Sequence, residues 1–374
     1  MKITLIAGVR PNFIKAAPLW HALQRLPGTS LQWINTGQHR DPEMSAGLFA
    51  QLGLPAPDHT IAGNTPTPVQ ETARIALGLE PILEAQQPDW VLVIGDVTST
   101  LAAALAAKQS GFRVAHVEAG LRSGNRQMPE ELNRIAVDHL ADLLFPSEPS
   151  GIRNLDAEGI PASRVHFVGN VLIDALCLTL PVANRLNIEE IIRNASIRPE
   201  VLALPSEFAL FTFHRPTNVD SAEGLLRLIE CLERALKHIP VLFPVHPRTL
   251  NHLRRYSAGE ALGAWPNLYL LRPLAYAEII ALLTKAKLVV TDSGGIQEES
   301  TWLGKPCLTF RQETERPATV EYGTNTLVAD LNPATLEHLL MQVLAGRYKT
   351  GAIPPLWDGH AAERMAGVLD FAGS

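Results

Sequence analysis

Short apolar runs alternate with stretches of helical periodicity along almost the whole chain. In the first half, the apolar runs predict strands, and segments with apolar residues every three or four positions predict the helices between them. The predicted strands are 3–7, 31–35, 90–94, 114–117, 143–145 and 166–168, and the predicted helices are 13–26, 69–85, 99–107 and 130–141. Strands that alternate with helices in this way predict βαβ units with right-handed crossovers, and therefore a parallel sheet.

A second set of the same kind follows a polar segment, residues 181–205, which the helical stretch 171–180 leads into. We interpret this polar segment as a connection between two domains, because 374 residues exceed what one ordinary core holds. The predicted strands of the second set are 208–213, 241–245, 268–271, 288–291 and 306–310, and the predicted helices are 225–236, 279–283 and 296–302.

The expected fold class is therefore α/β, with two Rossmann-like domains facing across a cleft. We expect the domains at residues 1–170 and 171–355. A final helical stretch, 361–371, lies within residues 356–374, and we expect it to pack back on the N-terminal domain.

Composition narrows the class of protein. Apolar residues make up 46% of the chain and charged residues 19%, as in globular proteins, and the formal net charge is −6. Without a basic surplus, nucleic acid is not an expected partner. No apolar run approaches the roughly 18 residues of a membrane span, so no membrane partner is expected either.

The spacing of the cysteines and histidines predicts neither a redox motif nor a metal site. Cys177, Cys231 and Cys307 lie far apart in apolar runs without C-x-x-C spacing, so we expect reduced core residues in a cytoplasmic protein. The apolar run at the N-terminus is too short for a secretory signal. No H-x-x-x-H or H-x-E-H spacing occurs, so neither a metal nor another cofactor is expected.

Polar residues gather where predicted strands end, and open α/β sheets bind ligands beyond the carboxyl ends of their strands. The most informative segment is H-V-E-A-G-L-R, residues 116–122, because Glu118 is an acid at the exit of an otherwise buried strand. Farther on, Pro129, Glu130 and Glu131 suit the positive end of a helix dipole without any function. Glu118 has no such structural explanation and is therefore a candidate ligand contact.

The segment Asp292-Ser293-Gly294-Gly295 follows a predicted strand and opens a predicted helix. Two interpretations stay open. Glycines let a ligand approach the backbone, and N–H groups at a helix start bind phosphate oxygens. A tight turn with Ser293 as a plain N-cap explains the same residues. Glu298 and Glu299, one turn later, either reach a ribose diol or only complement the helix dipole.

Five further candidates also have plain structural explanations. Arg10 and Lys15 flank the first helix start, where a cation is electrostatically misplaced, so they either pair with phosphates or are solvated. Arg316, in a proline-bounded loop, is a similar candidate from the second domain. Asp96 ends the strand 90–94 and either caps the next helix or reacts. His214, like His39, His116 and His246, stands near a strand end, where a lone histidine is more often a satisfied polar residue.

Taken together, these segments resemble the non-hydrolysing UDP-N-acetylglucosamine 2-epimerases. The matching segments run in the family's order over residues 1–330: G-V-R-P-N-F-I-K, G-Q-H, G-D-V-T-S-T, H-V-E-A-G-L-R-S, P-E-E-L-N-R, G-N-V-L-I-D-A, F-H-R, D-S-G-G-I-Q-E-E and T-E-R-P. The resemblance implies the glycosyltransferase type B fold, a UDP-sugar as ligand and a homodimer. It also implies that the first domain carries catalytic carboxylates and the second binds UDP.

The implied reaction is a reversible epimerisation at C2 of UDP-GlcNAc to UDP-ManNAc, for cell-surface polysaccharide precursors. A base removes the C2 proton, UDP leaves by anti elimination to give 2-acetamidoglucal, and UDP adds back as the other face of C2 is protonated. By motif match the catalytic residues are Asp96, Glu118, Glu130 and His214. The implied UDP contacts are Arg10, Lys15, Ser293, Gly294, Gly295, Glu299 and Arg316, with Glu299 on the ribose. We expect Arg122, Asn133 and Arg134 to orient Glu118 and Glu130, and Glu131 to serve the helix dipole.

The chain also departs from the family pattern. The family commonly has an acid at Asn12, Arg-Glu at Pro216-Thr217 and a further acid at Ala318. Val69 stands where members with a regulatory UDP-sugar site carry Arg, so regulation through that site is not expected. These departures leave open a related substrate, a UDP-2,3-diacetamido or uronate sugar. Two other classes of protein also stay open: a type B glycosyltransferase, which needs an acceptor pocket, and a non-catalytic nucleotide-sugar sensor, which is expected to have lost an acid.

Overall fold

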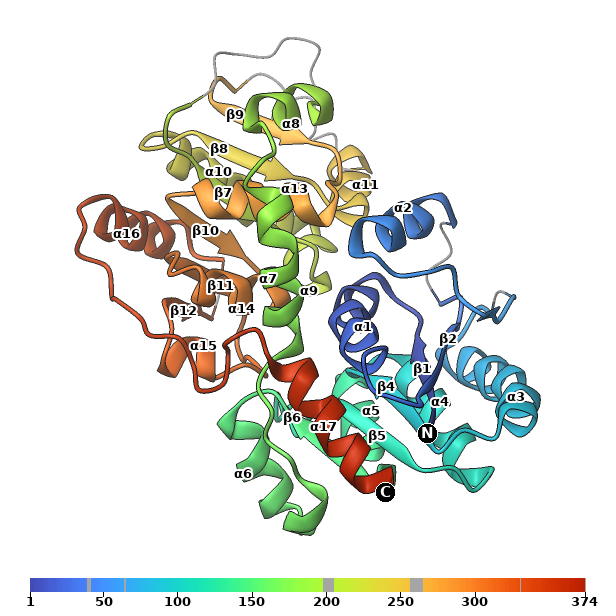
Figure 1. The fold of residues 1–374 in the computed structure, drawn as a ribbon. Helices are drawn as coiled ribbons and strands as arrows, with labels where there is room; N and C mark the ends of the chain where they lie inside the picture. Colours follow the sequence, from blue (N-terminus) through green and yellow to red (C-terminus); the bar gives the residue numbers. More distant parts are fainter. Residues whose placement is uncertain (39–41, 64, 198–204, 256–264, 330, 374) are drawn as a thin grey trace. The chain divides into compact units, whose positions relative to one another are not determined.

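The computed structural model describes residues 1–38, 42–63, 65–197, 205–255, 265–329 and 331–373 (Figure 1). The chain divides into two compact units, one formed by Met1–Leu178 with Pro355–Ser374 and the other by Thr179–Pro354. Each unit contains one six-stranded sheet in which all the pairs of neighbouring strands are parallel. The alternation of strands and helices in the sequence therefore corresponds to two α/β units.

The first sheet has the strand order β3-β2-β1-β4-β5-β6. Its strands are β1 (Lys2–Ala7), β2 (Ser30–Asn35), β3 (His59–Thr60), β4 (Trp90–Ile94), β5 (Val114–Ala119) and β6 (Leu143–Pro146). The helices of this unit are α1 (Arg10–Leu23), α2 (Pro42–Leu52), α3 (Pro68–Gln86), α4 (Thr98–Gln109), α5 (Pro129–Leu140), α6 (Pro149–Ala157) and α17 (Ala361–Gly373), with α7 (Val171–Ala183) crossing into the second unit. This is the 3-2-1-4-5-6 order of Rossmann folds, whose ligand crevice opens between the first and fourth strands.

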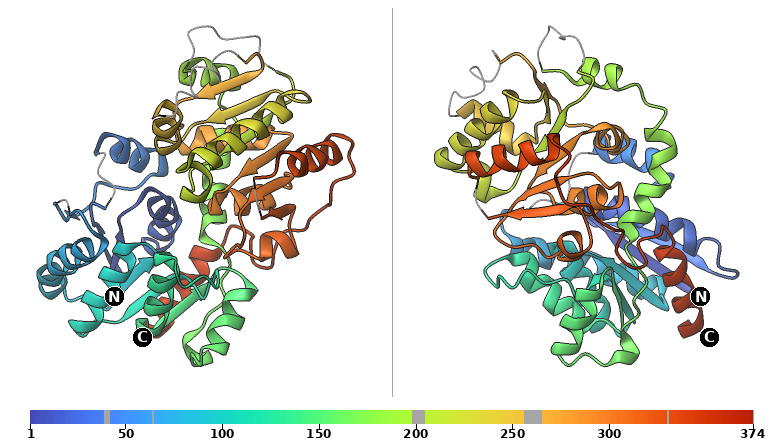
Figure 2. Two further views of the ribbon diagram at one scale, coloured as in Figure 1. Left: turned by 180° about the vertical axis from the view of Figure 1, so that it is seen from behind. Right: turned by 90° about the vertical axis from the view of Figure 1, so that its left-hand side faces the viewer.

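The second sheet has the order β12-β11-β10-β7-β8-β9, which is the same 3-2-1-4-5-6 pattern when it is read from β9. Its strands are β7 (Ala209–Thr212), β8 (Val241–Pro244), β9 (Leu268–Leu271), β10 (Leu288–Thr291), β11 (Cys307–Phe310) and β12 (Asn325–Val328). The helices are α8 (Ile188–Ala195), α9 (Pro216–Val219), α10 (Ala222–Leu236), α11 (Pro247–Arg255), α13 (Tyr276–Lys285), α14 (Gly294–Trp302), α15 (Ala318–Glu321) and α16 (Pro333–Leu344). Here the strand order reverses between β7 and β10 (Figures 1 and 2).

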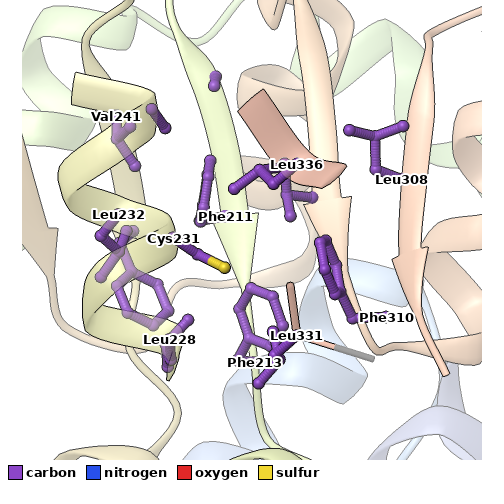
Figure 3. Close-up of a cluster of buried hydrophobic side chains, with 14 of the residues drawn as sticks. Phe211, Phe213, Leu228, Cys231, Leu232, Val241, Leu308, Phe310, Leu331 and Leu336 are labelled. Carbon is purple, nitrogen blue, oxygen red and sulfur yellow. The ribbon is translucent and has the colours of Figure 1, made fainter. Parts of the chain in front are cut away.

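An apolar core fixes β7 and β10 beside each other. Leu228 and Leu232 on α10 pack with Phe211 and Phe213 in one buried cluster, which α16 also joins (Figure 3). These leucines are four residues apart and so lie on one face of the helix. Because the core holds both strands from one side of the sheet, the residues that follow them emerge together at its carboxyl edge.

The structure corrects three predictions about the strands. Residues 166–168 are not a strand: only Val165 bridges to Leu144, and the chain then reaches Gly169, whose φ of +94° turns it away. The sixth strand of the first sheet is instead β3, which has two residues and so shows no periodicity. The edge strand β12 is absent from the predicted set, because Asn325 and Thr326 interrupt its apolar run.

The C-terminal helix α17 belongs to the first unit, where it packs against α1 (Figure 1). Asp174 on α7 accepts hydrogen bonds from the backbone N–H groups of Ala361 and Ala362, at 3.1 and 2.7 Å, and so caps the start of α17. Over the described residues no single helix combines the length and apolarity of a membrane span. Only α7 and α8 taken together reach both, and they are bent by 97°.

The Asp174 carboxyl is expected to make stability depend on pH. Burial raises its pKa from 3.8 to about 6, against the two backbone hydrogen bonds that lower it. The folded state therefore keeps this proton up to about pH 6, whereas the unfolded chain releases it near pH 3.8. Raising the pH from 4 to 6 should lower the free energy of unfolding by about 2 kcal/mol through this group alone. Urea unfolding of wild type and Asp174→Asn at both pH values tests this, because the variant should lack this part of the change. An identical pH dependence in the two proteins would contradict it.

Candidate active site

The predicted site residues form two groups, one in each unit, and both lie at a point where strand order reverses. In the first unit, Arg10 and Lys15 lie on α1, which follows β1, and Asp96 follows β4. Glu118 is near the end of β5, and Glu130 is in the first turn of α5. In the second unit, the residues follow β7, β10 and β11: His214, Ser293, Gly294, Gly295, Glu299 and Arg316. Each group therefore occupies the carboxyl edge at which Rossmann-like sheets bind ligands.

A buried ion pair joins Lys15 and Glu118. The Lys15 Nζ donates to Glu118 Oε2 in a very short contact, and both residues are almost fully buried. Asn12, one turn before Lys15, donates from Nδ2 to the carbonyl of Ile94 at 2.8 Å. A Cβ atom on Gly95 would lie 3.4 Å from both the Asn12 Oδ1 and the Glu118 Oε2 atoms. Asn12, Glu118 and the Gly95-Asp96 turn therefore meet at one place between β1, β4 and β5.

The backbone at Glu118 is unusual for a residue that is not glycine. Its φ is +68°, in the left-handed region, and the register of β5 against β6 shifts between Val117 and Ala119. A bulge of this kind re-aims a side chain, and such bulges are common beside active sites. The conformation costs on the order of 1–3 kcal/mol, so the surrounding structure must hold it in place.

Asp96 is held by α5. Its carboxylate pairs with Arg134, and its backbone carbonyl accepts a hydrogen bond from Asn133 Nδ2 at 2.9 Å. Glu130 lies one turn before Asn133 on the same helix and is exposed. The helix thus carries Glu130 and fixes Asp96 at the same time.

These contacts show what the supporting residues bind. Asn133 and Arg134 contact Asp96, because their turn of α5 faces the Gly95-Asp96 turn. Arg122 instead pairs with Asp138 and Glu158, at 2.7 Å in each case. Glu131 does more than complement the helix dipole.

The Glu131 carboxylate shapes the loop before α5. It accepts hydrogen bonds from the backbone N–H groups of Ser123 and Gly124, at 2.8 and 3.0 Å, and from the Ser123 hydroxyl. The two neighbouring acids of the P-E-E segment therefore differ: Glu131 is used by the protein itself, and Glu130 is exposed.

In the second unit, His214 is paired with Asp292. The His214 Nδ1 and Asp292 Oδ1 atoms are 3.0 Å apart, and Asp292 also accepts from the backbone N–H groups of His214 and Arg215. Burial alone would raise the pKa of Asp292, but His214 and the backbone donors outweigh it and lower the pKa. An ionised Asp292 makes Nδ1 the protonated nitrogen and directs Nε2 away from the carboxylate. His214 therefore presents the nitrogen that can exchange a proton with a ligand.

The start of α14 is a cradle for an anion. Ser293 is the N-cap residue, but its side chain makes no capping hydrogen bond, so the plain N-cap interpretation lacks its usual contact. The first N–H groups of any helix lack partners within it and bind anions. Arg316 lies across Gly294, where a Cβ atom would be only 2.7 Å from Arg316 Nη1. A larger residue at 294 would therefore displace the guanidinium from its place at the helix start.

Arg316 is one of three arginines around Glu315. Arg311 Nη2 is 2.6 Å from Glu315, Arg316 makes a shorter contact with it, and Arg215 lies 3.8 Å away. Burial would raise the pKa of Glu315, but these arginines hold it well below its usual value. Burial and the neighbouring Arg311 lower the pKa of Arg215.

The second carboxylate in this cluster is Glu298, which lies 2.8 Å from Arg316 Nε. Three arginines and two carboxylates, Glu298 and Glu315, therefore lie together beside α14. The other acid of the Q-E-E segment, Glu299, contacts Tyr276: its Oε1 accepts a hydrogen bond from the Tyr276 hydroxyl at 2.8 Å.

Several of these partners are not among the residues that the sequence singles out. Asp292 has no role in the sequence prediction, although a buried acid at a strand end is a usable signal. Glu315 stands within the T-E-R-P segment and Arg311 a few residues before it, so their closeness to Arg316 along the chain is a second usable signal. Tyr276 gives no such signal in the sequence.

The predicted candidate His39 lies outside the described residues. Within those residues, no group of three or more His, Cys, Asp or Glu side chains is placed to hold a metal.

Two sheets of 3-2-1-4-5-6 order, with polar clusters at both reversal points, define a protein of the glycosyltransferase type B fold class. A sequence model described as UDP-N-acetylglucosamine 2-epimerase matches residues 21–370. The chain belongs to the UDP-N-acetylglucosamine 2-epimerase family. The predicted enzyme class, an isomerase, is confirmed by this membership, and the chain is separated from the glycosyltransferases that share the fold.

Two similar proteins, one of them also through its solved structure, illustrate the membership. The UDP-N-acetylglucosamine 2-epimerase of Methanocaldococcus jannaschii is 34% identical over 382 residues, which cover 99% of both chains. A UDP-2,3-diacetamido-2,3-dideoxy-D-glucuronate 2-epimerase of Pseudomonas aeruginosa is 40% identical over 331 residues, which cover 88% of both chains. The crystal structure of the M. jannaschii enzyme in complex with UDP-GlcNAc and UDP superposes with a TM-score of 0.88 at 33% identity, covering 99% of this chain and 100% of that one.

Proposed function

We propose that the protein interconverts UDP-GlcNAc and UDP-ManNAc by reversible epimerisation at C2 of the sugar. The observation that carries the proposal is the group of carboxylates at the β1–β4 reversal point, where Glu118, buried and paired with Lys15, lies against the Gly95-Asp96 turn. It is supported by membership of the family and by the similar M. jannaschii enzyme, whose structure contains UDP-GlcNAc and UDP.

The chemistry requires what these residues supply. A carboxylate accepts the proton from C2, the C1–O bond breaks with its electron pair leaving on UDP, and a C1=C2 double bond forms in 2-acetamidoglucal. UDP then adds back to C1 while an acid delivers a proton to the opposite face of C2. Because the two faces need separate proton donors and acceptors, we assign Asp96, Glu118, Glu130 and His214 to this acid–base group.

The departing diphosphate needs positive charge. We assign its binding to the start of α14 at Ser293, Gly294 and Gly295, together with Arg316, and to Arg10 and Lys15 from the first unit. Helix N–H groups and guanidinium groups stabilise phosphate oxygens, and this stabilisation grows as negative charge develops on the leaving group. Glu299, held by Tyr276, is assigned to the ribose diol.

Gly294→Ala should weaken UDP binding by about 10- to 100-fold, the equivalent of one lost charge-assisted hydrogen bond. The added methyl group would lie 2.7 Å from Arg316 Nη1, and Glu298 and Glu315 restrict where that guanidinium can move. Titration calorimetry with UDP measures the change. Gly367→Ala is the matched control, because a Cβ atom at Gly367 has nothing within 4 Å and should leave binding unchanged. Equal affinity in Gly294→Ala and wild type would remove Arg316 from the cradle.

A second candidate substrate is a UDP-2,3-diacetamido uronate. The observations that favour it are the 40% identity to the P. aeruginosa enzyme of that name and the neutral Asn12, which lies beside Glu118 where the family commonly has an acid. A neutral amide at this position removes one negative charge that would repel a sugar carboxylate. The reaction at C2 is the same for both sugars.

A direct comparison of the two substrates tests the assignment. Purified protein is incubated separately with UDP-GlcNAc and with the UDP-2,3-diacetamido uronate, and the products are identified by NMR. We expect kcat/KM to be higher for UDP-GlcNAc, with UDP-ManNAc as the product. Turnover of the uronate alone would transfer the proposal to the second candidate, and turnover of neither would reject both.

We further propose a cytoplasmic homodimer that supplies precursors for cell-surface polysaccharide. A surface that supports self-association is the outer face of α3, where Val69 and Leu77 are about two turns apart and 78% and 69% exposed. Light scattering should give twice the chain mass of 40.7 kDa, and Leu77→Lys should lower it. A wild-type mass of one chain would reject the homodimer.

A further inference from the structure

A buried histidine–aspartate pair lies next to the proposed catalytic acids and has no role in the proposed reaction. His116, on β5, and Asp138, on α5, have no solvent exposure. The His116 Nδ1 and Asp138 Oδ1 atoms are 2.6 Å apart, and His116 Nε2 lies 2.8 Å from the carbonyl oxygen of Gly95.

The hydrogen bonds determine the protonation of this pair. A carbonyl oxygen only accepts, so His116 Nε2 must carry a proton. Burial would raise the pKa of Asp138, but His116 and Arg122 outweigh burial and lower it, so this carboxyl is ionised and Nδ1 must also donate. These hydrogen bonds therefore require both ring nitrogens of His116 to donate, one to the Gly95 carbonyl and one to Asp138.

The pair holds two points of the backbone. Through Nε2, His116 binds the carbonyl of Gly95, the residue immediately before Asp96. Through Oδ2, Asp138 accepts from the N–H group of Gly120, two residues after Glu118, at 3.0 Å. Gly95 and Gly120 have φ values of +72° and +78°, and Glu118 itself is at +68°. Both acids are thus carried by left-handed turns that the same ion pair ties together.

We propose that His116 and Asp138 are positioning residues, which hold Asp96 and Glu118 at a fixed separation for proton transfer at C2. The inference rests on the proposed function. Small displacements of catalytic groups are costly, and a shift of about 1 Å can lower a rate by about 100-fold. The pair fits this role because it binds the backbone of the two acid-bearing turns, at Gly95 and Gly120.

Further charged side chains contact the His116–Asp138 pair. Arg122 lies 2.7 Å from Asp138 Oδ2 and makes two hydrogen bonds of 2.7 Å to Glu158. Arg164 donates to the backbone carbonyl of Asp138 at 3.3 Å. Two guanidinium groups, Arg122 and Arg164, therefore contact Asp138, and Arg122 is the one that helps to hold its carboxyl ionised.

The variants Asp138→Asn and His116→Gln test the proposal. Each removes one charge of the pair and keeps a polar side chain of similar size. We expect kcat for epimerisation to fall by about 10- to 100-fold in both, while KM and the affinity for UDP change by less than about threefold. If Asp138→Asn does not fold, the kcat of His116→Gln alone tests the proposal.

Asp142→Asn is the matched control. Asp142 accepts from Lys108 at 2.8 Å and from the backbone N–H group of Val114, so it also anchors β5, but at the opposite end of the strand. A merely structural role predicts that all three variants lose thermal stability together and keep the wild-type kcat per folded molecule. The positioning role predicts that only the His116 and Asp138 variants lose kcat.

A readout independent of activity completes the experiment. In 15N spectra of histidine-labelled wild type at pH 7.5, both ring nitrogens of His116 should be protonated, and Asp138→Asn should change this signal. A neutral His116 in the wild type, or variants with the wild-type kcat, would overturn the proposal. If the wild type itself does not epimerise the sugar, the proposed function fails, and the 15N result still decides whether the buried ion pair exists.

Discussion

Glu118→Gln is expected to lower the exchange of the C2 hydrogen with solvent by about 10²- to 10⁴-fold, the usual contribution of a general acid or base. Glutamine has the same shape and can still accept from Lys15, but it cannot take a proton from carbon. Since Glu118 lies at the reversal point of the first sheet and UDP is assigned mainly to the second unit, UDP affinity should stay within about threefold of wild type.

The measurement is NMR of the sugar in deuterated water, with calorimetry for UDP. Asp142→Asn is a suitable control here as well, because Asp142 also pairs with a lysine, Lys108, but lies away from the carboxyl edge. Exchange at the wild-type rate in Glu118→Gln would remove this residue from the acid–base group. Loss of UDP binding together with exchange would indicate that the unpaired charge of Lys15 had disturbed the site.

Asp96→Asn should have an effect of similar size, about 10²- to 10⁴-fold on exchange. Its carboxylate is paired with Arg134 yet 24% exposed, so it is accessible to a ligand while its orientation is fixed. The double variant with Glu118→Gln should be little slower than either single variant, because groups that act in one step are not additive.

The control for Asp96 is Asp89→Asn, at the amino end of the same strand β4. Asp89 accepts from the backbone N–H group of Lys2 at 2.7 Å and has no role in the proposed chemistry. It should keep full exchange. A loss of exchange in Asp89→Asn equal to that in Asp96→Asn would mean that β4 is only being destabilised.

The central elements of both sheets can be predicted because their apolar runs are continuous. Strands β4 and β10 lie at the predicted residues, and β1 differs by one residue. Prediction fails at the edges. The two-residue β3 carries no period, and the apolar run 166–168 has the pattern of a strand although the backbone there pairs only at the preceding residue, Val165.

The sequence identifies single residues of the candidate site but not the contacts between them. Strand-end reasoning and the family resemblance identify Glu118, Asp96 and His214. They do not show that Lys15 binds Glu118 across 103 residues, or that Asp292 accepts from the backbone of His214 across 78. The rotation of α5 about its axis is also absent from the sequence pattern, so the contacts of Asn133 and Arg134 with Asp96 are not predicted. Such contacts follow from sheet order and helix rotation, which spacing along the chain does not contain.

Proton transfer at C2 of a UDP-sugar can be observed by incubating the protein with UDP-GlcNAc in deuterated water and following both epimers by NMR. We predict UDP-ManNAc formation with deuterium at C2 of the product and, as the reaction reverses, of the remaining substrate. UDP-ManNAc that retains the original hydrogen at C2 would refute this mechanism, since the proton would then never have been exchanged with solvent through an acid–base group of this protein.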